Sequence, residues 1–159
     1  MEPGPGQESV WDYPRPPKLE PVSDRIRVLF GGQQIANSKS AFRVLETSHP
    51  PTYYIPPADV GSGVLRPNAL RSMCEWKGQS RYFDVVVNGA VAEQAAWCYP
   101  KPVRAFAEIK DHVAFYAHHM QECWVGDKRV QPQVGDFYGG WITSNIVGPF
   151  KGPPGTRFW

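Results

Sequence analysis

Proline and glycine restrict the fold of this chain more than any other feature of its sequence. The 159 residues include 17 prolines and 15 glycines, and they are spread over the whole length. Proline breaks the interior of a helix and glycine weakens it, so long helices are excluded. The length matches one domain, and a hydrophobic content of 42% is enough to build a core. We therefore expect a mainly β domain with many turns.

Alternating apolar and polar residues predict short strands joined by tight turns. The strongest turn signal is Asn88-Gly89, a dipeptide typical of two-residue hairpin loops. Residues 58–71, in contrast, are predicted to form a loop. The predicted strands cover residues 25–30, 34–38, 41–48, 52–55, 73–77, 81–87, 90–92, 95–99, 123–125 and 128–130.

One substantial helix is predicted over residues 103–114. Val103, Phe106, Ile109 and Val113 recur at spacings of three and four, which would place them along one face of a helix. Such a helix would cover or brace the sheet.

The ends of the chain are expected to be extended. Residues 1–22 are rich in proline and contain Trp11 and Tyr13, which predicts an arm that packs on the domain. Residues 23–159 would then form a single β-rich domain. Within it, residues 137–159 are dominated by glycine, proline and aromatic side chains, and we expect an ordered loop that packs back onto the sheet.

Charge and cysteine content argue against several classes of protein. Seventeen basic and fifteen acidic side chains give a net charge of +2 without a basic run, so nucleic acid is not an expected partner. No apolar stretch is long enough to span a membrane and no secretory leader is recognisable, which predicts a cytoplasmic protein. The three cysteines, Cys74, Cys98 and Cys123, form no C-x-x-C pair, so we expect free thiols that are dispensable for any activity. We also expect no structural zinc, no other metal site and no evident cofactor.

Aromatic and polar residues concentrate in four segments, residues 46–54, 74–78, 95–100 and 137–143. Large aromatic rings can form the walls of a slot, while a few hydroxyls, an imidazole and carboxylates orient what enters it. Glycines beside such rings indicate a close approach of the backbone to a ligand or to another strand. The predicted ligand-binding residues are Glu46, Ser48, His49, Tyr53, Tyr54, Glu75, Trp76, Lys77, Trp97, Tyr99, Tyr138, Gly139, Gly140 and Trp141.

Glu46 and His49 are the candidate catalytic residues. In a strand over 41–48, Glu46 shares a face with Phe42 and Val44, where an unpaired carboxylate is costly to bury. Its partner would be a basic side chain, His49, or a ligand. Adjacency in sequence does not establish a catalytic triad with Ser48, since a triad depends on geometry.

Two further segments resemble known motifs only superficially. His118-His119 lacks a third metal ligand at a diagnostic spacing and is assigned to the surface. Residues 148–156 contain glycines, Lys151 and Thr156, but their order is not that of a phosphate-binding loop, and no helix can start among these prolines.

These motifs resemble the family named domain of unknown function 427, which also carries a nucleotidyltransferase-like label. The matching stretches are VWDYPRPP, VLETSHPPTYYIPP, CEWKG, RYFD, AAWCYP, FYGGWIT and IVGPFKGPPGT. The resemblance implies a compact tent-like β fold of the Mss4-like kind, with the polar and aromatic motifs around one cleft. It implies no established activity.

The sequence is compatible with three functions. The first is a small-molecule-binding domain, with catalysis left undecided, acting as a monomer or homodimer. The second is a metal-dependent nucleotidyltransferase, although the chain has no D-x-D motif and only Glu46 and Glu75 could share a metal. The third is a noncatalytic module whose proline-rich arm contacts a protein partner.

Overall fold

The computed structural model describes residues 2–135 and 138–159, and these residues are mainly β. They form fifteen strands and four short 3₁₀ helices. The mainly β fold predicted from the composition is therefore confirmed. Asp136 and Phe137, the latter part of a predicted binding segment, lie outside the described residues.

Five sheets make up the described part of the chain. One four-stranded sheet has the order β10 (Ala114–Phe115), β9 (Ala90–Cys98), β8 (Gly78–Val87) and β7 (Leu65–Cys74). A second has the order β12 (Lys128–Arg129), β11 (Glu122–Val125), β3 (Ile26–Phe30) and β4 (Gln33–Ser38). The smaller sheets are β2 (Lys18–Pro21), β5 (Phe42–Leu45) and β6 (Thr52–Tyr54); β1 (Glu8–Ser9) and β15 (Ile146–Val147); and β13 (Gln131–Pro132) and β14 (Trp141–Ile142).

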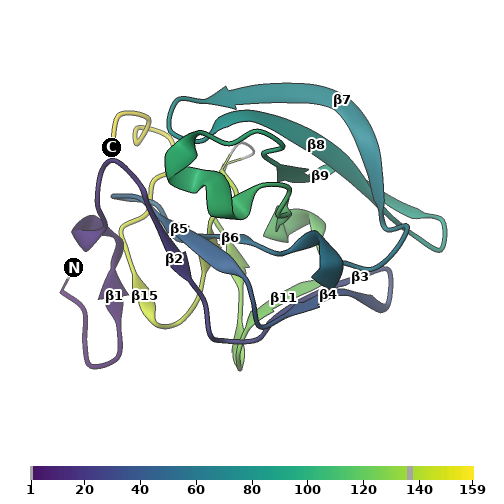
Figure 1. Cartoon of the computed structure of the whole chain (residues 1–159). Helices are drawn as coiled ribbons and strands as arrows, with labels where there is room; N and C mark the ends of the chain where they lie inside the picture. The colour runs from purple at the N-terminus through teal and green to yellow at the C-terminus, as the bar shows by residue number, and fades with distance from the viewer. Residues whose placement is uncertain (1, 136–137) are drawn as a thin grey trace.

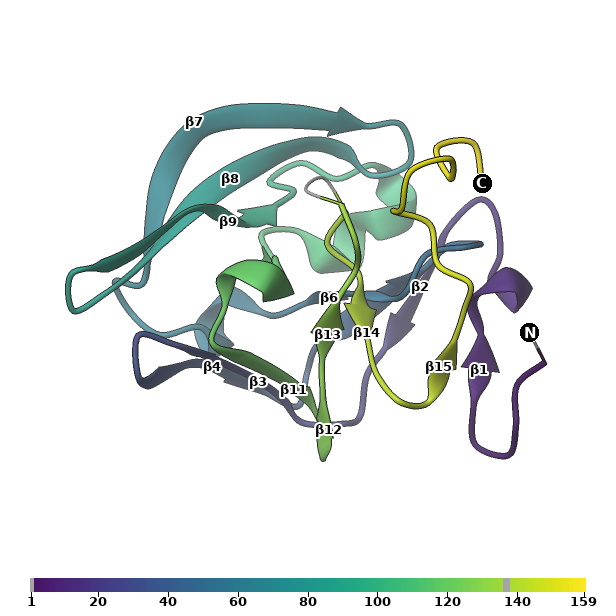
Figure 2. The same cartoon turned by 180° about the vertical axis from the view of Figure 1, so that it is seen from behind.

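The long strands β7, β8 and β9 arch over one side of the molecule, and β3, β4 and β11 lie on the opposite side (Figures 1 and 2). The core between them contains buried hydrophobic side chains from both sheets, including Val28, Val85 and Phe115. A second buried cluster is mostly aromatic and lies under the β7–β9 sheet. This aromatic cluster borders the candidate site.

The hairpin between β8 and β9 shows how local sequence sets the register. Asn88 and Gly89 have φ values of +48° and +84°, the combination that a type I′ turn requires. Val87 and Ala90 pair directly across this turn. The predicted hairpins at residues 25–38 and 123–130 also form, as β3–β4 and β11–β12.

The prediction of a loop over residues 58–71 was wrong for its second half. Residues from Leu65 onward belong to β7, the edge strand of its sheet. Most of its side chains are exposed, so no alternation of apolar and polar residues marks it. It also contains Pro67, which an edge strand tolerates beside the irregular pairing between Pro67 and Arg71. Residues 75–77, predicted as strand, form the turn into β8.

The substantial helix predicted over residues 103–114 was also wrong. The structure has only η3 (Arg104–Ile109), a 3₁₀ segment interrupted at Phe106, whose φ and ψ are −117° and 19°. Val103, Phe106 and Ile109 are spaced by three, and this period fits a 3₁₀ helix as well as an α-helix. Its first turn has no side-chain cap, and the chain then turns at Asp111 with a φ of +60°. The other 3₁₀ helices are η1 (Val10–Asp12), η2 (Pro57–Asp59) and η4 (Ala117–His119).

The proline-rich N-terminal segment contacts the rest of the chain at several points. β1 pairs in parallel with β15, and β2 pairs with β5. The indole of Trp11 donates a hydrogen bond to the carbonyl of Pro149 over 2.8 Å, and its ring lies 5.3 Å from that of Trp159. The two termini consequently lie on the same side of the molecule (Figure 1).

No helix among residues 2–135 and 138–159 has the length and hydrophobicity that a bilayer-crossing segment needs.

Candidate functional site

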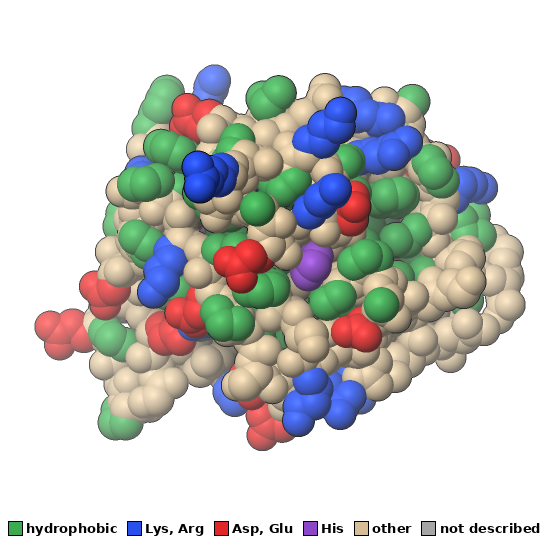
Figure 3. All heavy atoms as spheres, in the orientation of Figure 1, with side chains coloured by type: hydrophobic (Ala, Val, Ile, Leu, Met, Phe, Trp, Pro, Cys, Tyr) green, Lys and Arg blue, Asp and Glu red, His purple; other side chains and the backbone are tan. Residues whose placement is uncertain are grey.

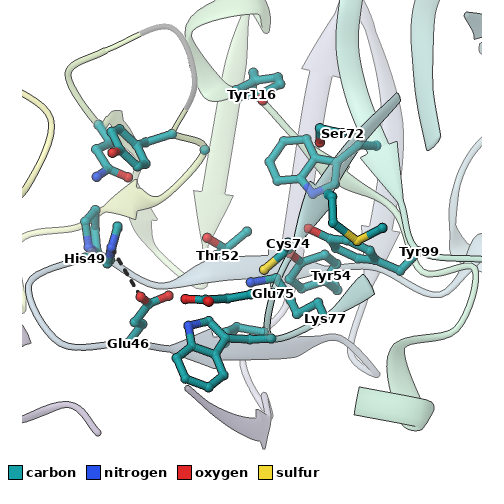
Figure 4. Close-up of a pocket in the computed structure, with 18 of the residues that line it drawn as sticks. Glu46, His49, Thr52, Tyr54, Ser72, Cys74, Glu75, Lys77, Tyr99 and Tyr116 are labelled. Atoms are coloured by element: carbon teal, nitrogen blue, oxygen red, sulfur yellow. Dashed lines mark ion pairs between the residues drawn. The ribbon is translucent and has the colours of Figure 1, made fainter. Parts of the chain in front are cut away.

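A cleft of about 320 Å³ opens beside the aromatic cluster. Its lining comes from the chain that follows β5, from the β7–β8 hairpin, from the end of β9 and from residues 133–151. Segments far apart in the sequence therefore meet here (Figure 4). Ten of the fourteen predicted binding residues line it: Glu46, His49, Tyr54, Glu75, Trp76, Lys77, Trp97, Tyr99, Tyr138 and Gly139.

The other four predicted residues do not line the cleft. Tyr53 and Tyr54 are neighbours in β6, and successive side chains of a strand point to opposite faces. Tyr54 reaches the cleft, whereas Tyr53 stacks on Trp141 with ring centroids 5.2 Å apart in the main core. The amide of Gly140 donates a hydrogen bond to Oε1 of Gln133.

Ser48 also lies outside the cleft lining. It is fully buried and is the third residue of a turn that brings Glu46 and His49 together. The expected strand over 41–48 ends at Leu45, so Glu46 does not continue the face of Phe42 and Val44, and that expectation was wrong. The His49 amide instead donates to the carbonyl of Glu46 over 3.0 Å, and Ser48 has a φ of +71°. A positive φ at the third position of such a turn is typical of type II. The Ser48 Oγ has no hydrogen-bond partner among the described residues.

Glu46 and His49 face each other at one end of the cleft (Figure 4). His49 Nε2 lies 3.6 Å from Glu46 Oε2, and an Nη2 of Arg15 lies 3.8 Å from the same oxygen. Both distances are too long for hydrogen bonds. The Glu46 side chain is 22% exposed. Glu46 thus has two nearby basic groups, and neither holds it in a tight buried ion pair.

His49 is an uncharged imidazole at neutral pH. Burial, together with the positive charges of Lys151, Arg15 and Lys77, lowers the pKa of His49 from 6.5 to about 4. Its ring packs against Tyr138 with centroids 5.5 Å apart. A neutral imidazole has one N–H donor and one nitrogen acceptor to offer a ligand.

Aromatic rings form the wall of the cleft on the side of β9. Trp97 packs against Tyr116 with centroids 4.5 Å apart and meets Tyr54 edge to face. Gly139 lies against the same indole, because a Cβ built at this glycine would be 2.1 Å from Cη2 of Trp97. The predicted close approach of the backbone is therefore to a side chain of the protein. Burial raises the pKa of Tyr54, Tyr99 and Tyr116 above the ordinary value, so these phenols stay protonated and can donate hydrogen bonds.

Two lysines reach the cleft from opposite segments. The Lys77 ammonium lies 5.9 Å from the ring centre of Tyr99 and 6.0 Å from that of Phe106. The Lys151 ammonium lies 5.4 Å from the ring centre of Tyr138. Such positions above ring faces are favourable for a cation.

Sequence reasoning missed about half of the lining. Thr52 and Cys74 lie within or next to predicted segments and could have been included on that ground. Lys151 belongs to the segment set aside because it is not a phosphate loop, and no local pattern points to Tyr116 or Gln133. The missed residues are Val44, Pro50, Thr52, Ser72, Met73, Cys74, Tyr82, Tyr116, Gln133 and Lys151.

No cluster of three or more metal-ligating side chains occurs within the described part of the chain. Glu46, His49, Cys74 and Glu75 line the same cleft, but no three of them are arranged so that they could hold a metal ion. Burial, and the charge of Asp111 to a smaller extent, raises the pKa of the Cys98 thiol to about 11, and burial raises that of Cys123 to about 12. These two thiols are poor nucleophiles, whereas Cys74 lines the cleft.

Comparison with known families agrees with the motifs. The model of a family described as a domain of unknown function (DUF427) matches residues 18–126, which is more than half of the chain. The protein belongs to this family. The matched residues supply most of the lining of the cleft, including that from the β7–β8 hairpin and β9, but they do not include residues 133–151. A search of curated proteins finds no match.

Proposed function

We propose that this protein binds a small molecule in the cleft between the β7–β8 hairpin and the turn at residues 46–49. The observation that carries the proposal is the combination of size and lining. A volume of about 320 Å³ is at the lower end of the range of small-molecule sites, which are mostly apolar with a few oriented polar groups. Here aromatic rings supply the apolar surface, and Glu46, His49 and Lys151 supply polar groups.

The protonation state of His49 favours binding over general-base catalysis. A catalytic base works best with a pKa near the operating pH, and the pKa of His49 is about 4. We therefore assign His49 the role of a hydrogen-bonding group toward the ligand, with Glu46 beside it. The proposal does not depend on a metal or cofactor.

Thermal shift with a panel of metabolites tests the proposal, because a ligand that binds only the folded state raises the melting midpoint. The matched variants are Trp76→Ala and Trp124→Ala. Both indoles are half-buried, but only Trp76 lines the cleft. We expect at least one metabolite to raise the midpoint of the parent and of Trp124→Ala, and to lose most of this effect in Trp76→Ala.

Two results would count against small-molecule binding at this cleft. One is a panel in which no compound shifts the midpoint. The other is a shift that survives in Trp76→Ala as fully as in Trp124→Ala. A shift obtained only with nucleotide and Mg²⁺ together would instead favour the nucleotidyltransferase alternative.

A further inference from the structure

Two lysines in the cleft have no acidic partner among the residues that the structure describes. Among the described residues, no carboxylate lies within ion-pair distance of Lys77 or Lys151, although both side chains are half-buried. A cation that loses part of its hydration is normally paired with an anion or a π face. In the described part of the chain, each of these ammonium groups instead lies over an aromatic ring.

The backbones of both lysines are fixed by hydrogen bonds. The carbonyl of Lys77 accepts from the Val103 amide over 2.9 Å. The amide of Lys151 donates to the carbonyl of Ser48 over 2.9 Å, and its carbonyl accepts from Nε2 of Gln133 over 2.6 Å. These bonds hold the backbone of Lys77 to the segment that follows β9, and that of Lys151 to Ser48 and Gln133.

The acidic groups of the cleft do not cancel these charges. Glu46 is already close to Arg15 and His49, and Glu75 is exposed. Both lysines act on the same region, since the charges of Lys151 and Lys77 contribute to the low pKa of His49. The phenols of Tyr54 and Tyr99 stay protonated, so they add no negative charge to the cleft.

We infer that the ligand of this cleft is a small molecule that combines a flat unsaturated ring with a carboxylate or phosphate group. Lys77 and Lys151 contact the anionic group, and the rings of Trp97 and its neighbouring tyrosines pack against the flat part. This inference rests on the proposed function and adds the chemical class of the ligand. The volume of about 320 Å³ restricts the ligand to the size of a simple metabolite.

A second group of cations on the surface provides the control. Arg71, Arg81 and Lys101 line a separate groove of about 250 Å³ on the β7–β8 strands. Lys and Arg side chains also gather on the upper right of the face shown in Figure 3. Lys101→Met removes one charge outside the cleft and is matched to Lys77→Met and Lys151→Met.

The test compares four ring compounds by isothermal titration calorimetry at low ionic strength: benzoate, phenyl phosphate, neutral benzamide and cationic benzylamine. We expect the two anions to bind the parent at least about tenfold more tightly than benzamide or benzylamine, because charge-assisted hydrogen bonds to the lysines are available only to an anion. Lys77→Met and Lys151→Met should each weaken anion binding by about tenfold, with Lys101→Met within about twofold of the parent. Melting curves establish that every variant is folded.

The inference is overturned if benzamide binds as tightly as benzoate, or if anion binding is lost in Lys101→Met and retained in both cleft variants. It is also overturned if neither anion binds while another metabolite shifts the melting midpoint through Trp76, and the proposed function then survives. If no compound of either panel binds, both proposals fail.

Discussion

At the scale of single residues, the turn at residues 46–49 determines what the cleft can do. Ser48 adopts a positive φ that is uncommon outside glycine, and its buried hydroxyl has no hydrogen-bond partner within the described part of the chain. Both features cost stability, and the turn that has them places Glu46 and His49 side by side at the edge of the cleft. Residues with strained backbone conformations of this kind cluster at functional sites in folded proteins.

The low pKa of His49 predicts a pH dependence of stability. The unfolded imidazole has a pKa of 6.5 and the folded one about 4, so below pH 6.5 the unfolded state takes up a proton that the folded state does not. The contribution of His49 to the free energy of unfolding is therefore highest above pH 6.5 and decreases as the pH falls to 4. The difference corresponds to about 3 kcal/mol.

Urea denaturation of the parent and of His49→Gln between pH 7 and pH 4 measures this effect. We expect the parent to lose about 3 kcal/mol more unfolding free energy than the variant over this range. The exposed His118 provides the control variant His118→Gln, which should follow the parent. Parallel curves for the parent and His49→Gln would show that His49 does not titrate as described.

At the scale of elements, the cleft depends on the packing of residues 138–141 against β9. Gly139 has no Cβ to collide with Trp97, and the buried indole is packed against Tyr116 and Tyr54. The sequence predicted a close approach of the glycine pair before Trp141 to a ligand or to another strand, and the structure places Gly139 against the side chain of Trp97. Which side chain it approaches could not be predicted, because residues 97 and 139 are far apart in the chain.

Gly139→Ala should therefore destabilise the fold and distort the aromatic wall. A methyl group 2.1 Å from the indole forces one of the two segments to move, and overpacking of this kind costs about 1–3 kcal/mol. Gly4→Ala is the control, since its Cβ would meet only the flexible side chain of Gln7. Thermal melts that place Gly139→Ala at the midpoint of Gly4→Ala would contradict this account of the packing.

At the scale of the whole molecule, local patterns predicted turns and hairpins better than they predicted long-range contacts. Asn88-Gly89 determines its hairpin through the positive φ angles of a type I′ turn, and this preference can be predicted from the dipeptide itself. Most of strand β7 was missed because an exposed edge strand has no apolar face. Tyr116 and Lys151 enter the cleft only through tertiary packing.

The sequence indicated which segments contribute to the candidate site, but not which of their side chains enter it. Tyr54, Trp97 and His49 belong to dense aromatic and polar segments, and such segments stand out in a sequence. Their side-chain directions depend on where each strand ends, and β5 ends at Leu45 earlier than its alternation suggests. The tent-like arrangement, the cytoplasmic location and the monomeric or dimeric state stay predictions.

Nuclear magnetic resonance can show whether this cleft is the binding site. The isotope-labelled protein is titrated with the metabolite that gives the largest thermal shift, and perturbed amide and indole signals are mapped. We predict that the largest changes fall on His49, Thr52, Trp97 and the β7–β8 turn, all of which border the cleft. Changes confined to the groove of Arg71, Arg81 and Lys101, or to the N-terminal strands, would contradict the account.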